Sequence, residues 1–242
     1  DLCFTLAAVS LLVVAGNVVL LVAAWIATSL ALHRLLVFYP DRPAAIAAAH
    51  KKFVFARVGD GCLVVAAALL AATFGTTDIA RMLDAARGLG APDGAPVLAA
   101  GLLIALAAML KSAQFPAHGW LLEVMETPTP VSALLHAGII NAGGFLVLRF
   151  ADVMLLAPPA LHVLAVVGGL TALIGGVVML TQTSVKTSLA WSTVAQMGFM
   201  LLQCGLGAFA MAALHLVAHS LYKAHAFLAS GSAVEAVHLA RA

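Results

Sequence analysis

The sequence has few charged residues. Only 9% of its 242 residues are Asp, Glu, Lys or Arg, whereas 64% are hydrophobic. Soluble domains are about a quarter charged and about half apolar, so this composition excludes an ordinary soluble domain. The net charge of +2 and the lack of a basic run give no indication of a nucleic-acid partner, and we predict no nucleic-acid binding.

Sequence patterns for cofactor binding are also missing. The three cysteines, Cys3, Cys62 and Cys204, lie far apart in apolar segments without the spacing of metal ligands, so we expect buried, inert thiols. No G-x-G-x-x-G motif follows a strand, and nothing indicates nucleotide, haem, flavin or iron–sulfur ligation. We expect no cofactor, no metal and no bond-making chemistry on this chain, which is therefore not predicted to be an enzyme.

The sequence does contain long runs without a charged residue. They cover residues 2–33, 61–77, 94–110, 127–148, 153–185 and 187–222. Several of these runs exceed the roughly 20 residues that a helix needs to cross a bilayer. We predict an all-α polytopic membrane protein, multi-pass in a cell membrane (the inner or plasma membrane). The chain starts inside an apolar run without Met and stops just past a predicted helix, so we expect a fragment truncated at both ends.

Glycine, proline and charge divide this single membrane domain (residues 1–242) into about eight transmembrane segments. The predicted segments are residues 2–15, 18–38, 51–74, 95–115, 130–153, 158–181, 184–202 and 208–237, with a short interfacial helix at 44–50 and an exposed loop with a short helix at 75–94. Alternating spans place five basic residues on one face, Arg42, Lys51, Lys52, Lys186 and Arg241, and two on the other, Arg81 and Arg87. The positive-inside rule predicts that the first face is cytoplasmic.

Lys111 is the most informative residue, because it lies in a hydrophobic segment and is soon followed by Pro116. A charged side chain at membrane depth is costly and indicates a functional site, and a proline removes a backbone hydrogen bond from a helix. We predict that Pro116 breaks the helix and that Lys111 exchanges the transported ion. The alternative is that the aliphatic stem of Lys111 lets its ammonium reach the membrane interface.

Three histidines and a second lysine extend the polar character. His136 lies about two turns into its span and is predicted to carry protons, with a structural hydrogen bond as the alternative. His215, His219 and Lys223 recur at i, i+4 and i+8, so they project from one face of a helix. We predict that this stripe hands protons along. One alternative is a polar helix interface that moves no protons. The other is a zinc site, but the lack of a third ligand and the charge of Lys223 disfavour zinc binding.

Five other polar residues are candidates for a channel mouth or gate: Glu123, Glu126, Lys186, His33 and Arg34. The two glutamates flank the end of the broken helix, where solvated loop carboxylates are the alternative. The three basic residues lie near the ends of their spans, where anchoring at the membrane interface is the alternative.

Several stretches resemble the antiporter-like membrane subunits shared by respiratory complex I and Mrp-type cation/proton antiporters, above all the L-subunit type. These stretches are Phe53–Asp60, Lys111–Leu121, Thr127–Gly138, Ser188–Met200 and His215–Ser232. The resemblance implies an antiporter-like helical bundle with a broken helix and inverted repeats. The first repeat would cover about residues 1–155, and the opening part of the second would cover 156–242.

The same resemblance implies roles for the polar residues. Lys111 matches the lysine of the family's first broken helix, and His136 matches a Lys/His position in the following helix. His215, His219 and Lys223 match the central polar axis. His136 is therefore expected to relay protons from Lys111 toward that axis.

One departure from that family concerns the partner of Lys111. Family members place a glutamate directly after the tryptophan that matches Trp25, and this glutamate pairs with the lysine; here the position is Ile26. We therefore expect the proton affinity of Lys111 to depend on desolvation and on a different group. Glu123 and Glu126 are the nearest carboxylate candidates in sequence.

Residues 25–43 and 47–53 resemble instead the membrane subunit of the DAB inorganic-carbon accumulation complexes. The resemblance implies a proton- or cation-translocating subunit that energises uptake of bicarbonate or CO2. It also implies a large soluble partner that resembles a zinc carbonic anhydrase and carries the zinc. The alternatives are a proton-pumping subunit of NADH–quinone oxidoreductase with complex I subunits as partners, an Mrp-type sodium/proton antiporter, and a membrane scaffold that conducts nothing.

Overall fold

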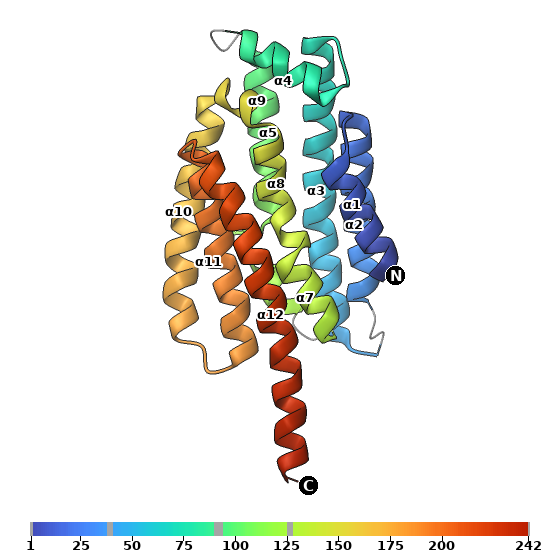
Figure 1. Cartoon of the computed structure of the whole chain (residues 1–242), viewed down its shortest axis with the longest axis vertical. Helices are drawn as coiled ribbons and strands as arrows, with labels where there is room; N and C mark the ends of the chain where they lie inside the picture. Colours follow the sequence, from blue (N-terminus) through green and yellow to red (C-terminus); the bar gives the residue numbers. More distant parts are fainter. Residues whose placement is uncertain (1, 38–40, 90–93, 125–127, 242) are drawn as a thin grey trace.

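The computed structural model describes residues 2–37, 41–89, 94–124 and 128–241, with side chains for all of these except residue 44 and residues 230–241. Within these ranges the chain is helical and forms no β-sheet. The long helices run side by side along the longest axis of the molecule (Figure 1). They are α1 (Leu2–Val14), α2 (Val18–Leu36), α3 (Pro43–Phe74), α5 (Ala95–Lys111), α10 (Pro158–Leu180), α11 (Val185–Gly205) and α12 (Phe209–Arg241).

Four helical stretches in the described ranges are long and apolar enough to cross a membrane. They are Val18–Leu36, Ala45–Phe74, Thr129–Arg149 and Pro158–Leu180. The apolar helices Leu2–Val14 and Ala95–Lys111 are shorter. The predicted all-α, multi-pass membrane architecture is therefore confirmed.

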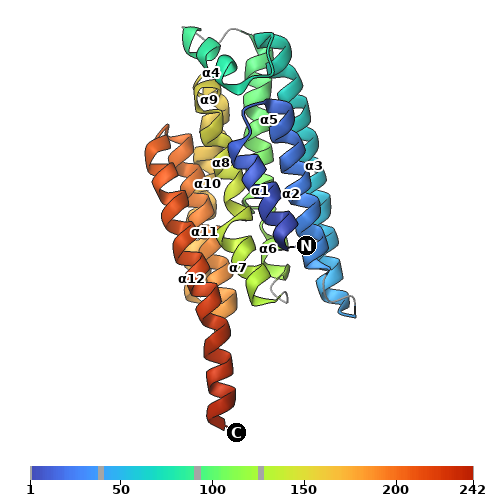
Figure 2. The ribbon, with the colours of Figure 1, turned by 45° about the vertical axis from the view of Figure 1, so that its right-hand side comes forward.

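The helices form two groups with α7 (Thr129–Ala137) and α8 (Ala142–Arg149) between them (Figures 1 and 2). In one group α1 packs on α2, α2 on α3, and α3 on α5. In the other group α10 packs on α11, and α11 packs on α12. α8 contacts α5 and α7 contacts α12, so the segment that carries His136 touches both groups.

Glycines let α10 and α11 approach closely. A Cβ on Gly198 would lie 2.5 Å from the backbone nitrogen of Ala172, and a Cβ on Gly205 would lie 2.3 Å from that of Ala165. Small residues at a helix interface in a membrane permit this direct backbone contact. α11 is therefore held close to α10 at two places along its length.

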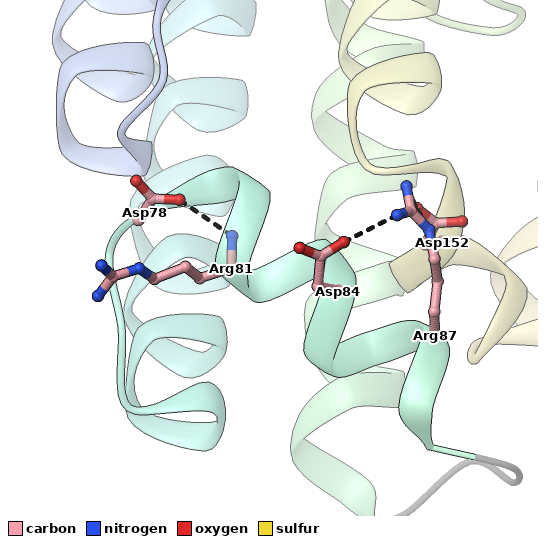
Figure 3. A network of polar contacts seen from close by, with 5 residues as sticks. All are labelled: Asp78, Arg81, Asp84, Arg87 and Asp152. Atoms are coloured by element: carbon pink, nitrogen blue, oxygen red, sulfur yellow. Dashed lines mark hydrogen bonds and ion pairs between the residues drawn. The ribbon is translucent and has the colours of Figure 1, made fainter.

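The short helix α4 (Ile79–Gly88) lies across one end of the bundle (Figure 1). Asp78 caps it, because its side chain accepts a hydrogen bond from the Arg81 N–H at 3.0 Å (Figure 3). Asn17 caps α2 and also donates from its side chain to Thr77 Oγ1 at 2.9 Å. The turn between α1 and α2 is therefore bound to the start of α4.

The last turn of α4 is bound by Arg87. Its guanidinium contacts Asp84 Oδ1 at 2.8 Å and Asp152 Oδ2 at 2.9 Å (Figure 3). Asp152 belongs to α9 (Ala151–Leu155), and its hydrogen bond and negative charge raise the pKa of Arg87. α4 is thus attached to different parts of the bundle at its two ends.

The course of α3 and the burial of the cysteines differ from the sequence predictions. The predicted interfacial helix at 44–50 and the predicted span at 51–74 form one continuous helix, α3, because alanine favours helix and no glycine or proline interrupts this junction. The three cysteines are not uniformly buried: Cys204 is buried, Cys62 is intermediate and Cys3 is exposed. The expectation of a buried thiol was wrong for Cys3, because it lies on α1 beside Leu2 and Phe4, which are exposed as well in the described part of the chain.

Candidate functional site

The helix that carries Lys111 is broken ahead of Pro116. α5 ends at Lys111 and not at the predicted Phe115, and the short helix α6 (Gly119–Glu123) follows the break. Proline has no N–H, so the Ser112 carbonyl, four residues before Pro116, has no helical partner, and the proline ring crowds that carbonyl. The helix therefore stops earlier than the position of Pro116 itself.

Side chains replace the missing backbone hydrogen bonds at the break. The Gln114 amide donates to Ser112 O at 2.9 Å, and the Phe115 N–H donates to Thr171 Oγ1 of α10 at 3.0 Å. The Ser112 hydroxyl donates to Ile140 O at 2.9 Å. Irregular backbone at membrane depth persists only where protein or water satisfies it. The break is therefore a supported feature of the bundle.

Lys111 points into the bundle from the end of α5. The residue is 7% exposed, and its Nζ lies 4.4 Å from the centre of the Trp25 ring. A cation over an aromatic face is attracted by the ring, but Nζ has no hydrogen-bond partner in the described part of the chain. The ammonium does not reach the surface of the chain. The alternative in which the aliphatic stem of Lys111 carries the ammonium to the membrane interface therefore does not describe this residue.

A small cavity adjoins Lys111. Its volume is about 10 Å³, and its lining includes Trp25, Lys52, Gly59, Lys111, Trp120 and Ile139. A cavity of this size has room for about one water molecule. Lys52 of α3 and Lys111 of α5 thus line one cavity that can hold a water molecule.

A carboxylate on α3 acts on both lysines. Asp60, whose side chain is 7% exposed, pairs with Arg57 at 2.5 Å, and its charge attracts Lys111 and Lys52. The Trp25 indole also interacts with Asp60. Asp60 was not predicted as a site residue, although its position eight residues after Lys52 places both on one face of a helix. That spacing is the signal by which the sequence identifies it.

Asp60 is not one of the two acidic residues, Glu123 and Glu126, that the sequence predicted as partners of Lys111. Glu123 pairs with Lys51 at 2.5 Å, and the two side chains are 45% and 46% exposed. The expectation that Glu123 serves Lys111 was therefore wrong, since a surface lysine already binds it; its role at a channel mouth stays a prediction. Glu126 lies outside the described residues. Ile26 faces a separate apolar groove of about 380 Å³ between α2 and α3.

A second interruption lies next to His136. One 3₁₀ turn separates α7 from α8, where the sequence predicted a single span. The Asn141 amide donates to Ala137 O and to the Ser220 hydroxyl, each at 2.8 Å. His219 Nε2 lies 3.3 Å from His136 O. α12 therefore binds the backbone at the place where α7 ends.

His136 is fully buried between α7, α11 and α12. Its Nδ1 lies 3.1 Å from Thr193 Oγ1, and its ring stacks on Phe227 at a centroid distance of 4.3 Å. The Thr193 hydroxyl donates its own hydrogen to Leu189 O at 3.0 Å, so Nδ1 of His136 is the donor and Nε2 carries the lone pair. Nε2 has no hydrogen-bond partner in the described structure. The ring is therefore fixed in orientation and retains a free proton acceptor.

The predicted stripe on α12 faces α7 and α11. The rings of His215 and His219 lie 6.1 Å apart. His215 Nδ1 lies 3.0 Å from Gln203 Oε1, and Lys223 donates to the Ser192 hydroxyl. The stripe and His136 thus form one polar cluster. Among the residues with described side chains, no three His, Cys, Asp or Glu side chains gather as a metal site requires.

The three basic candidates for a mouth or gate lie in different surroundings. Lys186 is in the first turn of α11, and its charge acts on His136. Arg34 is exposed near the end of α2. His33 stacks with His50 and Phe53 of α3, at ring distances of 5.8 and 4.8 Å. Lys186 therefore acts on His136 through its charge, whereas His33 belongs to the α2–α3 side of the bundle.

Comparison with known families and proteins gives a match over nearly the whole chain. Residues 15–241 match the family described as NADH:quinone oxidoreductase/Mrp antiporter, transmembrane. A probable inorganic carbon transporter subunit DabB of Hydrogenovibrio crunogenus is 52% identical over 96% of this chain and 44% of the relative. NADH-quinone oxidoreductase subunit L of Escherichia coli is 39% identical over 96% of this chain and 38% of the relative. The chain thus spans less than half the length of these relatives.

Solved structures share the fold. A chain of the Mrp complex from Dietzia sp. superposes with a TM-score of 0.86 at 35% identity, over 93% of this chain and 25% of that chain. A chain of a membrane-bound sulfane sulfur reductase, an archaeal respiratory membrane complex, superposes with a TM-score of 0.82 at 20% identity, over 93% of this chain and 47% of that chain. The second similarity supports the fold alone.

Proposed function

Because this chain belongs to the NADH:quinone oxidoreductase/Mrp antiporter transmembrane family, we propose that it is part of a subunit that moves protons or other cations across a membrane and thereby energises inorganic-carbon uptake. Three relatives named as probable inorganic carbon transporter subunits, at 47–52% identity, support the carbon branch of the proposal. Ile26, which replaces the paired glutamate expected of the complex I type, supports the same branch.

The surroundings of Lys111 carry the proposal. The amine is buried at a helix break, has no hydrogen-bond partner in the described structure, and adjoins a cavity with room for about one water. Asp60 attracts it while pairing with Arg57. Two cations thus compete for one carboxylate, and a shift of Asp60 toward either cation changes the stability of the charged amine. Such a site can bind and release a proton in turn.

From Lys111 the proposed path continues to the polar cluster. Ile139 lines the cavity at Lys111 and lies three residues after His136. His136 offers a free Nε2, and its neighbours on α12 are His219 and Lys223. In this proposal His136 passes protons between Lys111 and the stripe on α12, which includes His215.

The chain performs no bond-making chemistry in this proposal. Zinc chemistry belongs to a large soluble partner that resembles a carbonic anhydrase, and the complex lies in the inner or plasma membrane. Residues 1–155 form the first inverted repeat and residues 156–242 the start of the second. The similarity to a chain of the solved Mrp complex supports partner subunits in general.

The second candidate function is proton pumping within NADH–quinone oxidoreductase. Subunit L relatives at 39–42% identity favour it. Ile26 disfavours it, because that position holds no carboxylate to pair with Lys111. Measurement of bicarbonate uptake and of NADH-driven proton movement by the intact complex separates the two functions.

The test replaces Lys111 in the full-length subunit, within its complex in lipid vesicles. Lys111→Met keeps the length and apolar bulk of the side chain, and Lys111→Arg keeps a charge that hardly deprotonates. Both variants are expected to assemble and to lose ion transport by about tenfold or more. Arg81→Met, at an exposed position on α4, serves as the control. Normal transport by Lys111→Met removes Lys111 from the pathway, and normal transport by Lys111→Arg alone shows that the site needs a fixed cation.

A further inference from the structure

A second set of titratable side chains connects the surface with the cavity at Lys111. His50, at the beginning of α3, is exposed, and its ring lies 5.8 Å from the ring of His33 near the end of α2. One ring nitrogen of His33 interacts with the Ala49 backbone, and Nδ1 is buried without a hydrogen-bond partner in the described structure. An imidazole with a free nitrogen can accept a proton. His33 is therefore placed to take a proton from the surface.

Lys52 stands between these histidines and Lys111. It is 3% exposed, and its Nζ donates to Ser29 O at 3.0 Å and to Ser29 Oγ at 3.3 Å. Ser29 is neutral, so these hydrogen bonds do not neutralise the charge of a lysine that burial already makes costly. The charge of Lys52 acts on His33 on one side, and the charge of Lys111 acts on Lys52 on the other.

The two lysines line the same cavity of about 10 Å³, which has room for about one water. A buried water needs two to four polar partners. The Nζ of Lys111 and the Nε1 of Trp120 both lack a hydrogen-bond partner in the described structure, and Trp120 lines the cavity as well. The cavity therefore offers the polar groups that a single ordered water requires.

We propose that His50, His33 and Lys52 form a proton-access route to Lys111, and that one water in the cavity links the two amines. The inference rests on the proposed ion translocation. In the linking step the Lys52 ammonium gives a proton to the water oxygen while the water gives one of its own protons to the neutral Lys111 amine. One positive charge leaves Lys52 and one appears on Lys111. Lys52 regains its proton from solvent through His50 and His33.

The charges around the cavity fit the passage of one proton at a time. Lys52 and Lys111 each carry a positive charge only while protonated, whereas the guanidinium of Arg57 stays charged. Asp60 is the carboxylate that acts on all three among the described residues. Two ammonium groups at low dielectric repel each other, so a proton that arrives at one amine favours release from the other. The arrangement therefore promotes transfer between the amines.

The competing role for Lys52 is a tether between α2 and α3 through Ser29. Lys52→Arg distinguishes the roles, because a guanidinium still donates to the Ser29 carbonyl but hardly gives up a proton. His33→Phe provides a second test, since it keeps an aromatic ring against Phe53 and removes the titratable nitrogens. Arg81→Met on α4 is the matched control for loss of a cation.

The experiment measures ion transport by the full-length subunit within its complex in lipid vesicles, with assembly checked by size-exclusion chromatography. Lys52→Met and Lys52→Arg are both expected to slow transport by about tenfold or more. His33→Phe is expected to slow it by a smaller factor, about threefold or more, because water at the surface partly replaces a lost imidazole. Arg81→Met is expected to transport normally.

The outcomes test the access route through Lys52 separately from the proposed ion translocation at Lys111. Normal transport by Lys52→Met beside an inactive Lys111→Met overturns the access route and leaves the proposed function intact. Rescue by Lys52→Arg assigns Lys52 to the tether and also overturns the route. Normal transport by Lys111→Met removes Lys111 from the pathway, which overturns both the site that carries the proposed function and the route that leads to it. If Lys52→Met fails to assemble, His33→Phe decides, and its normal transport overturns the route.

Discussion

Substitution of Gly143 by alanine tests how tightly the broken helix is held. Gly143 lies on α8 where this helix passes α5. A Cβ at this position would lie 2.4 Å from Ala108 O and 2.3 Å from Ser112 Oγ. The Ser112 hydroxyl can rotate away only by losing its 2.9 Å hydrogen bond to Ile140 O. The Ala108 carbonyl belongs to the helix backbone and cannot rotate, so α5 and α8 must separate.

The size of the effect follows from these distances. An ordinary contact of a Cβ begins near 3.4 Å, so the two helices must separate by about 1 Å at Gly143. Overpacking of this kind costs about 1–3 kcal/mol, and a lost buried hydrogen bond adds about 1 kcal/mol. We therefore expect Gly143→Ala to destabilise the protein by about 2–4 kcal/mol. Transport should also fall, because the separation occurs one turn before Lys111.

The assay is thermal unfolding of the purified full-length complex in detergent, together with transport in vesicles. Gly176→Ala is the control, since a Cβ there meets nothing within 4 Å. Gly144→Ala should fall between the two, because its Cβ would meet the Met200 side chain at 2.2 Å, and a methionine side chain can move. Equal stability of Gly143→Ala and Gly176→Ala would refute the reasoning about the contact between α5 and α8.

Three further predictions concern charge and access. Asp60→Asn should slow transport by about tenfold, whereas the exposed Asp84→Asn should not; equal rates in a vesicle assay would exclude the α3 carboxylate from the mechanism. Cysteine scanning over 212–227 should show thiol labelling with a period near 3.6 residues, and uniform protection would contradict a hydrated face on α12. Asp152→Asn removes the negative charge that helps to raise the pKa of Arg87 but keeps an oxygen that can accept a hydrogen bond. Because exposed ion pairs contribute little, transport should stay within about twofold of normal. A larger loss would show that this contact does more than position α4.

The sequence predicts the helical segments well, because their composition and breakers are local properties. It places the end of α5 too late, since the breaker is Pro116 but the carbonyl that loses its helical N–H partner belongs to Ser112, one turn earlier. It also divides α3 at His50, because a cluster of basic residues resembles an interface. The structure shows that Lys52 turns inward to Ser29, a contact between helices that no local pattern reveals.

The sequence predicts only those site residues that stand out locally, and it does not reveal the contacts between helices. Lys111 and His136 are recognisable because they interrupt apolar runs. Asp60 is harder to recognise, since it stands at the boundary of such a run and resembles a flanking residue; only its helical spacing from Lys52 places it inward. The contact between Glu123 and Lys51 joins residues 72 positions apart, so sequence proximity to Lys111 was a poor guide to the partner of either side chain.

The attachment of α4 has a mechanical consequence for the bundle. At its first turn α4 is bound to the α1–α2 hairpin through Asp78, Thr77 and Asn17, and at its last turn it is bound to α9 through Arg87 and Asp152. This cross-brace joins the α1–α2 hairpin to α9 at one end of the bundle. Relative movement of the α1–α2 hairpin and α9 is therefore expected to be smaller at this end than at the opposite end, where α2 ends and α3 begins.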